Sequence, residues 1–251
     1  MHKNESNQIQ HEMNCLNRVI NEMSFESLYG FSEESYDLFM NEIKSANLNQ
    51  QNNDFPDLIT NNGFIEHFQV TSSPENKKGS LHKIKEITQK KNHEKKLNDL
   101  ARDDNVVSTV LDYHSHSYHS LKQSFKKNFE KHFKRIQSYS GIKDTGIFLI
   151  EYDDLGALSM GEIIDFNFEE GIFIGDIKIE PETFHNYRLS RDKFLLEYLA
   201  DYSEDIKFVI FLSEKIEIFD TNKINYYLSF IPNDYCIAPN ITKSSIRSIK
   251  I

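Results

Sequence analysis

Apolar residues recur with the spacing of an α-helix in four segments of the chain. The pattern predicts amphipathic helices over residues 13–28, 33–46, 120–139 and 191–202, and Ser32 is placed to cap the second of them. The third helix has the strongest pattern. Its apolar stripe consists of Leu121, Phe125, Phe129, Phe133 and Ile136, and its other side carries Lys122, Lys126, Lys127, Lys131, Lys134 and Arg135. This segment is therefore predicted to be a basic amphipathic helix whose aromatic stripe faces the core.

Continuous apolar runs predict the strands. Residues 146–152 and 207–212 are apolar on both faces, which is typical of central strands covered by helices. Further strands are expected over 163–168, 171–179 and 215–220, and residues 106–111 are interpreted as a short strand or a buried turn. The end of the chain, 232–251, is interpreted as irregular or as one edge strand. The fold class predicted from this alternation is α/β (α+β), with a mixed central sheet flanked by helices.

One hairpin organises this prediction. Residues 54–60 and 63–71 are short apolar runs joined by the polar turn Asn61-Asn62-Gly63. An Asn-Gly pair between apolar runs is a strong hairpin signal, because both residues tolerate positive φ.

The hairpin carries two acids, Asp57 near the start of its first strand and Glu66 inside its second. Carboxylates on adjacent strands can jointly hold a hard divalent cation, which polarises a phosphoryl group or its attacking water. The alternative is an ordinary hairpin whose acids face solvent.

The sequence Pro56-Asp57, followed after the hairpin by Glu66, resembles the PD-(D/E)XK nuclease superfamily. The resemblance implies a restriction-endonuclease-like core in which Asp57 and Glu66 bind Mg²⁺ or Mn²⁺ and cleave DNA. Phe68 stands where that family has lysine, so Gln69, or Lys77 or Lys78 from the following loop, would have to assist. Because strand side chains alternate, Gln69 and Glu66 are expected on opposite faces unless a bulge intervenes.

Charge divides the chain unevenly. The formal net charge is −10, yet residues 76–135 hold fifteen Lys and Arg against seven Asp and Glu. Residues 72–111 are interpreted as a Lys-rich helical arm inserted into a single nuclease-like domain, 1–251.

A basic middle segment can follow a phosphate backbone, so nucleic-acid contacts are predicted at Lys77, Lys78, Lys122, Lys126 and Lys127. A solvated arm is the alternative.

Other candidate chemistry is weaker. Residues 112–119 hold three histidines and an aspartate, which could bind a metal, contact phosphate or simply pack. Asp153 and Asp154 follow a central strand, where ligands gather, although acids there also form turns. Cys15 and Cys236 are interpreted as having no cysteine or histidine neighbour at metal-ligand spacing, so we expect reduced thiols in a cytoplasmic protein.

Several classes of protein are disfavoured. The sequence has no Gly-rich phosphate loop, G-x-S-x-G elbow, H-E-x-x-H motif or CxxC pair. No apolar run reaches membrane-spanning length, and no signal for export is evident.

Two functional hypotheses follow. The first is a Mg²⁺-dependent DNA nuclease, which the resemblance places in phage defence or mobile elements. The second is a catalytically degenerate nuclease-fold protein that binds a nucleic-acid or protein partner, such as a phage-encoded or defence-associated interaction protein. A homo-oligomer is also compatible with the composition.

Overall fold

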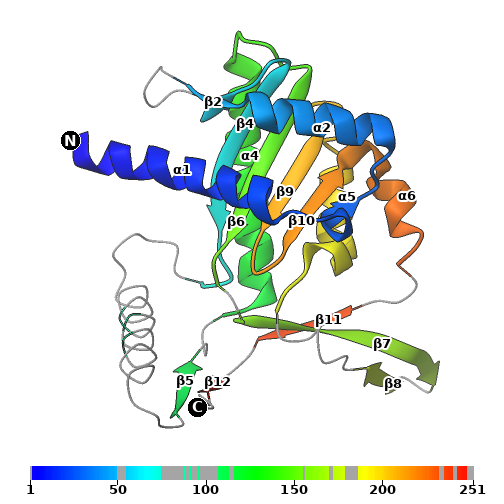
Figure 1. Cartoon of the computed structure of the whole chain (residues 1–251). Coiled ribbons are helices and arrows are strands. Elements are labelled where there is room, and N and C mark those ends of the chain that lie inside the picture. The colour runs from blue at the N-terminus through cyan, green and yellow to red at the C-terminus, as the bar shows by residue number, and fades with distance from the viewer. Residues whose placement is uncertain are drawn as a thin grey trace.

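The computed structural model describes residues 2–49, 55–74, 107–112, 116–154, 156–169, 172–178, 186–231, 235–239 and 242–247, together with residues 88, 91 and 95. Its centre is a seven-stranded mixed sheet with the order β1-β10-β9-β6-β4-β3-β2 (Figure 1). The strands are β1 (Leu28–Tyr29), β2 (Asn47–Leu48), β3 (Leu58–Ile59), β4 (Gly63–Val70), β6 (Thr145–Tyr152), β9 (Phe208–Leu212) and β10 (Ile216–Asp220). The predicted α/β class is confirmed. The Lys-rich arm predicted over 72–111 falls largely outside the described residues.

Strand directions explain why the sheet is mixed. The central strands β4, β6 and β9 run parallel, whereas β3 and β10 pair antiparallel at their two sides. β6 lies between β4 and β9, and Glu151 is its one residue that is not buried. The sequence prediction of a central, helix-covered strand at this position is confirmed.

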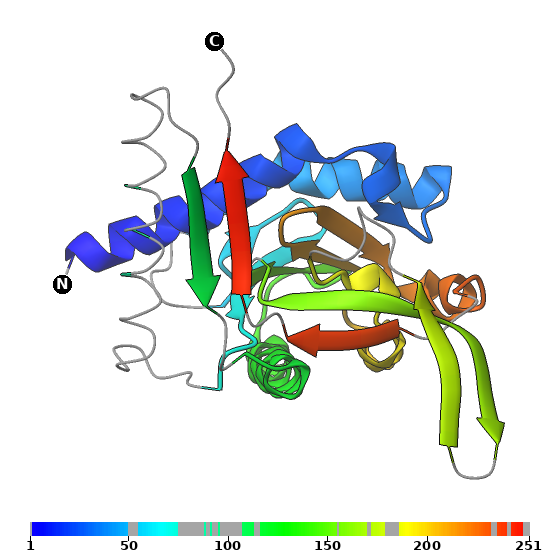
Figure 2. The same cartoon turned by 90° about the horizontal axis from the view of Figure 1, so that it is seen from below.

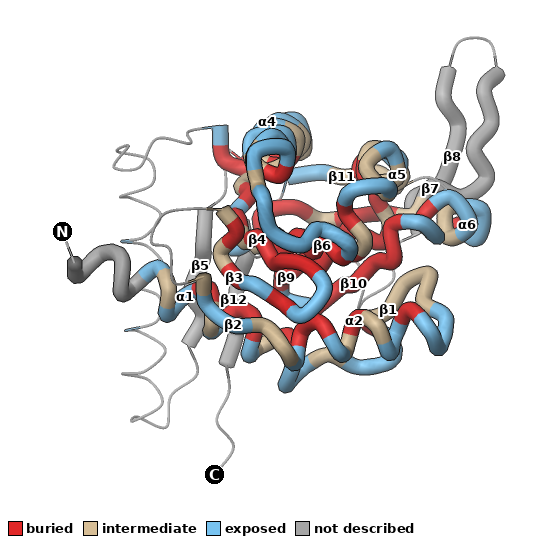
Figure 3. The backbone as a smooth tube through the Cα atoms, turned by 90° about the horizontal axis from the view of Figure 1, so that it is seen from above, coloured by how far each residue is buried: buried red, intermediate tan, exposed pale blue. Residues whose placement is uncertain are grey.

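Helices cover both faces of the sheet. Helices α1 (His2–Glu22) and α2 (Glu33–Ser45) lie on one face, and α4 (Tyr118–Ser138), α5 (Lys193–Ala200) and α6 (Ile224–Leu228) lie on the other (Figures 1 and 3). Short 3₁₀ turns occupy Phe25–Ser27, Leu189–Arg191 and Thr221–Lys223. All four predicted helices are present, and Ser32 caps α2 as expected, accepting from the backbone N–H of Ser35.

The beginning and end of α1 differ from the prediction. It starts at His2 rather than Met13 and ends at Glu22 rather than Leu28. Its first half is polar, so it has no apolar period to reveal it. Beyond its end, Ser24 begins a 3₁₀ turn and Leu28 enters β1.

Each face of the sheet has its own apolar core. Beneath α4 and α5, the stripe residues Phe125 and Phe129 pack with Phe68 and Phe148. Beneath α1 and α2, Leu16 and Phe39 are among the residues that pack against the inward side chains of the same strands. The aromatic stripe of α4 is therefore core, as predicted.

The predicted hairpin is present, with Leu58 opposite Ile65, but Gly63 serves a different purpose from the one expected. Its φ is not positive; the two described glycines with positive φ are Gly30 and Gly156. A Cβ at Gly63 would lie 1.9 Å from the carbonyl oxygen of Thr145. Glycine is needed here because β6 starts against the backbone of β4.

The remaining strands form two small sheets (Figure 2). β7 (Leu158–Glu169) lies between β8 (Ile172–Lys178) and β11 (Tyr235–Pro239), and β5 (Val107–Asp112) pairs antiparallel with β12 (Thr242–Arg247). The hairpin of β7 and β8 was predicted, and of the two alternatives for residues 106–111, a strand or a buried turn, the structure has the strand β5. The expectation of an irregular or single-strand end is wrong, because β11 and β12 pair with strands distant in sequence, which a local pattern does not reveal.

Candidate functional site

The hairpin brings its two acids together. Asp57 directly precedes β3, and its backbone N–H donates to Glu66 Oε2 at 3.1 Å. The backbone N–H of His67 donates to Asp57 Oδ2 at 2.7 Å. The sequence therefore placed Asp57 and Glu66 correctly beside each other.

Glu66 is enclosed by protein donors. Its side chain is fully buried, and its Oε1 accepts from His132 Nδ1 at 2.5 Å and from Arg135 Nη1 at 3.0 Å, both on α4. We call Asp57, Glu66, His132 and Arg135 the Glu66 cluster. The Glu66 carboxylate thus accepts three hydrogen bonds, one from the hairpin and two from α4. It therefore holds the hairpin against α4, which is a structural role.

Burial governs the protonation of this cluster. Desolvation raises the pKa of Glu66 to about 7, against the opposing effect of Arg135. Desolvation and then the charge of Glu66 raise the pKa of Asp57 to about 6. Burial, with Lys131 and Arg135 nearby, lowers the pKa of His132 to about 4, so this histidine is neutral at pH 7.

Phe68, at the family's lysine position, belongs to the core. It is buried, and its ring stacks on His132 with a centroid distance of 4.8 Å. Among the described residues, the cationic side chain that lies beside Asp57 and Glu66 is Arg135, not a lysine. Lys77 and Lys78, the other predicted helpers, lie outside the described residues.

Gln69 is not brought to this cluster. Its Nε2 donates to Glu151 Oε2 at 2.7 Å, on the face of the sheet that α1 covers. β4 has no bulge here: its pairing with β6 is continuous from Gly63 to Val70. The expected alternation holds, so Gln69 cannot act with Glu66.

A second group of polar side chains surrounds Gln69. His11 and Cys15 from α1, His67 from β4 and Glu151 from β6 lie together, and we call these four residues the α1 cluster. Glu151 Oε2 lies 2.8 Å from His11 Nε2 and 3.2 Å from His67 Nε2. Cys15 Sγ lies 3.8 Å from His11 Nε2.

The carboxyl pKa of the α1 cluster is shifted in the opposite direction from those of the Glu66 cluster. Burial alone would raise the pKa of Glu151, but hydrogen bonds from His67, Gln69 and His11 lower it to about 2. Burial, and next the charge of Glu151, raise the pKa of the Cys15 thiol to about 12. The cluster thus holds a stable carboxylate among nitrogen and sulfur atoms.

The sequence contains a signal for this cluster that our expectation about the cysteines overlooked. The premise that Cys15 has no histidine neighbour was wrong, because His11 is four residues before it. Both cysteines are free thiols, as expected. On a helix, residues four apart share one face, which is a common arrangement for metal ligands. Starting the predicted helix at Met13 left His11 outside it and concealed the pair.

The predicted nucleic-acid-binding lysines that are described all lie on α4. Lys122 Nζ lies 4.7 Å from the centroid of Tyr118 and 4.6 Å from that of Phe194. Lys126 Nζ lies 4.4 Å from the centroid of Phe194. Lys127 is exposed.

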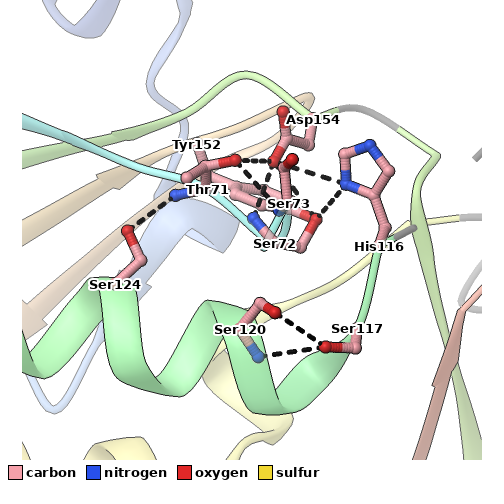
Figure 4. Close-up of polar contacts among 9 residues, drawn as sticks. All are labelled: Thr71, Ser72, Ser73, His116, Ser117, Ser120, Ser124, Tyr152 and Asp154. Atoms are coloured by element: carbon pink, nitrogen blue, oxygen red, sulfur yellow. Dashed lines mark hydrogen bonds and ion pairs between the residues drawn. The ribbon is translucent and has the colours of Figure 1, made fainter. Parts of the chain in front are cut away.

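Two of the weaker candidates, His116 and Asp154, belong to one hydrogen-bonded network (Figure 4). Asp154 Oδ2 accepts from the backbone N–H of Ser72 at 2.7 Å and from Thr71 Oγ1 at 2.6 Å. Ser72 Oγ also lies 2.7 Å from His116 Nδ1. His119 instead pairs with Gln123 on α4, so the described histidines of this segment do not converge on a metal site. The network fixes the end of β4 against the start of α4.

Comparisons with models of known protein families, with curated proteins and with solved structures found no match. No helix in the described part of the chain has the length and apolarity required to cross a lipid bilayer.

Proposed function

We propose that the protein is a nucleic-acid-binding protein built on a nuclease-like core that has lost catalysis at the Asp57–Glu66 pair. The order of elements supports a core of this kind. Helix α2 precedes the acid-bearing hairpin, α4 follows it, and β6 then returns parallel to the second hairpin strand. In the nuclease superfamily that the sequence resembles, a helix likewise precedes the acid-bearing hairpin and another follows it and packs on the sheet. A shared order of elements does not by itself imply a shared function.

The basic face of α4 is the observation that carries the proposal. In a chain of net charge −10, this helix bears six Lys and Arg and a single acid, Glu130. Lys127, Lys131 and Lys134 are exposed, and no described helix or strand covers the outward side of α4 in Figure 3. A row of cations on an otherwise acidic protein favours a polyanionic partner.

An aromatic ring adjoins two other lysines of α4. Phe194 on α5 is 45% exposed and lies beneath the ammonium groups of Lys122 and Lys126. A partly exposed ring beside cations is an arrangement with which proteins stack a base and hold the nearby phosphates. We therefore assign single-stranded nucleic acid as the preferred ligand.

The Glu66 cluster fits a magnesium or manganese ion poorly. Glu66 is fully buried, and its two oxygens already accept from Asp57, His132 and Arg135. Such an ion would have to displace these donors and compete with the charge of Arg135. Phe68 supplies no ammonium in place of the missing lysine.

A Mg²⁺- or Mn²⁺-dependent DNA nuclease of a phage-defence system is the second candidate. The environment of the Asp57 carboxyl group favours this nuclease function. This carboxyl is partly exposed, and its pKa is raised to about 6. Perturbed carboxyl groups of this kind are enriched at catalytic sites.

Fluorescence anisotropy with labelled single-stranded DNA, duplex DNA and RNA tests the proposal. We expect salt-dependent binding that is strongest for single strands. A variant with alanine at Lys127, Lys131 and Lys134 should bind at least about tenfold more weakly, because each lost phosphate contact removes counterion release. The matched control places alanine at the exposed residues Lys44, Lys215 and Lys223, away from α4. Equal affinity of both triple variants, or no binding by the parent protein, would contradict the proposal.

A further inference from the structure

We propose that the α1 cluster is a Zn²⁺ site that joins α1 to strands β4 and β6. This site is independent of the nucleic-acid surface on α4 and lies on the opposite face of the sheet.

The donor atoms already have nearly the spacing of a zinc site. One ligand atom from each of the four residues lies within 4.8 Å of all the others. Glu151 Oε2 lies 2.8 Å from His11 Nε2 and 3.2 Å from His67 Nε2, and Cys15 Sγ lies 3.8 Å from His11 Nε2. Zinc bonds of about 2.0 Å to nitrogen and 2.3 Å to sulfur place tetrahedral ligand atoms roughly 3.3–3.8 Å apart. Small side-chain shifts would therefore suffice.

The types of donor atom in the α1 cluster favour zinc over magnesium. Two imidazole nitrogens, one thiol sulfur and one carboxylate oxygen make a mixed, fairly soft set. Magnesium requires oxygen ligands, whereas zinc accepts this combination with four-coordinate geometry. The thiol binds as a thiolate, and its proton passes to solvent.

Hydrogen bonding alone leaves the His11 ring with conflicting neighbours. His11 Nε2 faces the acceptor Glu151 Oε2 at 2.8 Å and the amide donor Gln69 Nε2 at 3.3 Å. A single ring nitrogen either donates or accepts, so no tautomer satisfies both neighbours. A cation among these atoms would take the lone pairs of His11 and Glu151. Gln69 would still donate to Glu151, as partners of metal-bound carboxylates do.

The ligands come from rigid elements. His11 and Cys15 share one face of α1, while His67 and Glu151 share one face of the adjacent parallel strands β4 and β6. Arg18, on the same helix, fixes α1 by donating to the carbonyl oxygens of Ser213 and Glu214. The side chain of His11 is 45% exposed, which leaves the metal a path from solvent.

Cobalt is the probe that tests this inference. The full-length, untagged protein is treated with chelator, then titrated with Zn²⁺ alone and with Co²⁺ alone. We expect one ion per chain, a thiolate-to-cobalt charge-transfer band and a higher melting temperature with zinc. Cys15→Ser should lose the charge-transfer band. Cys236→Ser, at the other cysteine, should keep it. Gln69→Ala should weaken zinc binding about tenfold.

Three results would show that the α1 cluster is not a zinc site. Failure of the folded parent protein to bind zinc would overturn the proposal, as would a charge-transfer band that survives in Cys15→Ser or disappears equally in Cys236→Ser. If Cys15→Ser does not fold, Glu151→Gln replaces it. That variant must then bind zinc more weakly than His119→Gln, a control on α4.

Discussion

Glu66 and Gln69 lie three residues apart on β4, yet their side chains point to opposite faces of the sheet. Glu66 accepts from His132 and Arg135 beneath α4. Gln69 donates to Glu151 beneath α1. One short strand therefore separates two polar clusters, of which the first is enclosed by protein donors and the second resembles a metal site.

Replacing Glu66 with alanine should destabilise the protein. The change leaves the Arg135 and His132 donors and the Asp57 N–H without their buried acceptor, which should cost about 3 kcal/mol in the free energy of unfolding. Urea denaturation measures this loss. Glu130→Ala, at the exposed acid of α4, is the control and should change stability by less than about 0.5 kcal/mol. A Glu66→Ala protein as stable as the control would show that Glu66 is not structural.

Replacing Gly63 with alanine should also destabilise the fold. The added Cβ would meet the Thr145 carbonyl oxygen at 1.9 Å, so β4 and β6 must move apart. We expect a loss of about 1–3 kcal/mol, the usual cost of overpacking, by the same denaturation assay. Gly141→Ala is a useful comparison, because its close neighbour is the Tyr139 side chain, which can move. Equal losses would indicate that the strand contact is not rigid.

The sequence predicted much of this architecture and only part of its chemistry. The helix at 120–139 was recognisable because its apolar residues repeat with helical spacing, and the strand at 146–152 because it is a continuous apolar run. The proximity of Asp57 and Glu66 followed from the hairpin. The enclosure of Glu66 could not be foreseen, because His132 and Arg135 reach it only once α4 packs on β4. The α1 cluster combines three distant segments, and only its pair His11 and Cys15 was visible locally.

The stability contributed by Asp192 should depend on pH. Burial raises the pKa of Asp192 above its ordinary value of 3.8, more than hydrogen bonds from Tyr187 and Tyr118 lower it. The folded protein therefore binds this proton more tightly than the unfolded chain does. The resulting stability is fully present below about pH 3.8 and is lost as the pH rises through the raised pKa.

Asp192→Asn isolates this effect, since its amide carries no charge at any pH. The deficit in stability of Asp192→Asn relative to the parent protein should shrink as the pH rises from about 4 to 8. Urea midpoints of both proteins across that range measure it. A deficit that stays constant, or grows with pH, would show that the folded state does not raise this pKa.

Removing the exposed ring of Phe194 should weaken binding of single strands more than of duplexes. Stacking of one base on an aromatic side chain contributes about 1–3 kcal/mol, so Phe194→Ala should lose roughly tenfold or more in affinity for single-stranded DNA. Phe25→Ala removes a ring that is 90% exposed near α2 and should have no effect. Equal losses for single strands and duplexes would assign Phe194 a role other than stacking.

We propose that this protein binds nucleic acid without cleaving it at Asp57 and Glu66. The most direct measurement incubates the parent protein and Asp57→Asn with labelled single-stranded DNA and Mg²⁺ or Mn²⁺, and records binding and strand length in the same samples. We predict bound, intact DNA for both proteins. Metal-dependent cleavage by the parent protein that is lost in a folded Asp57→Asn would contradict the claim and establish the nuclease.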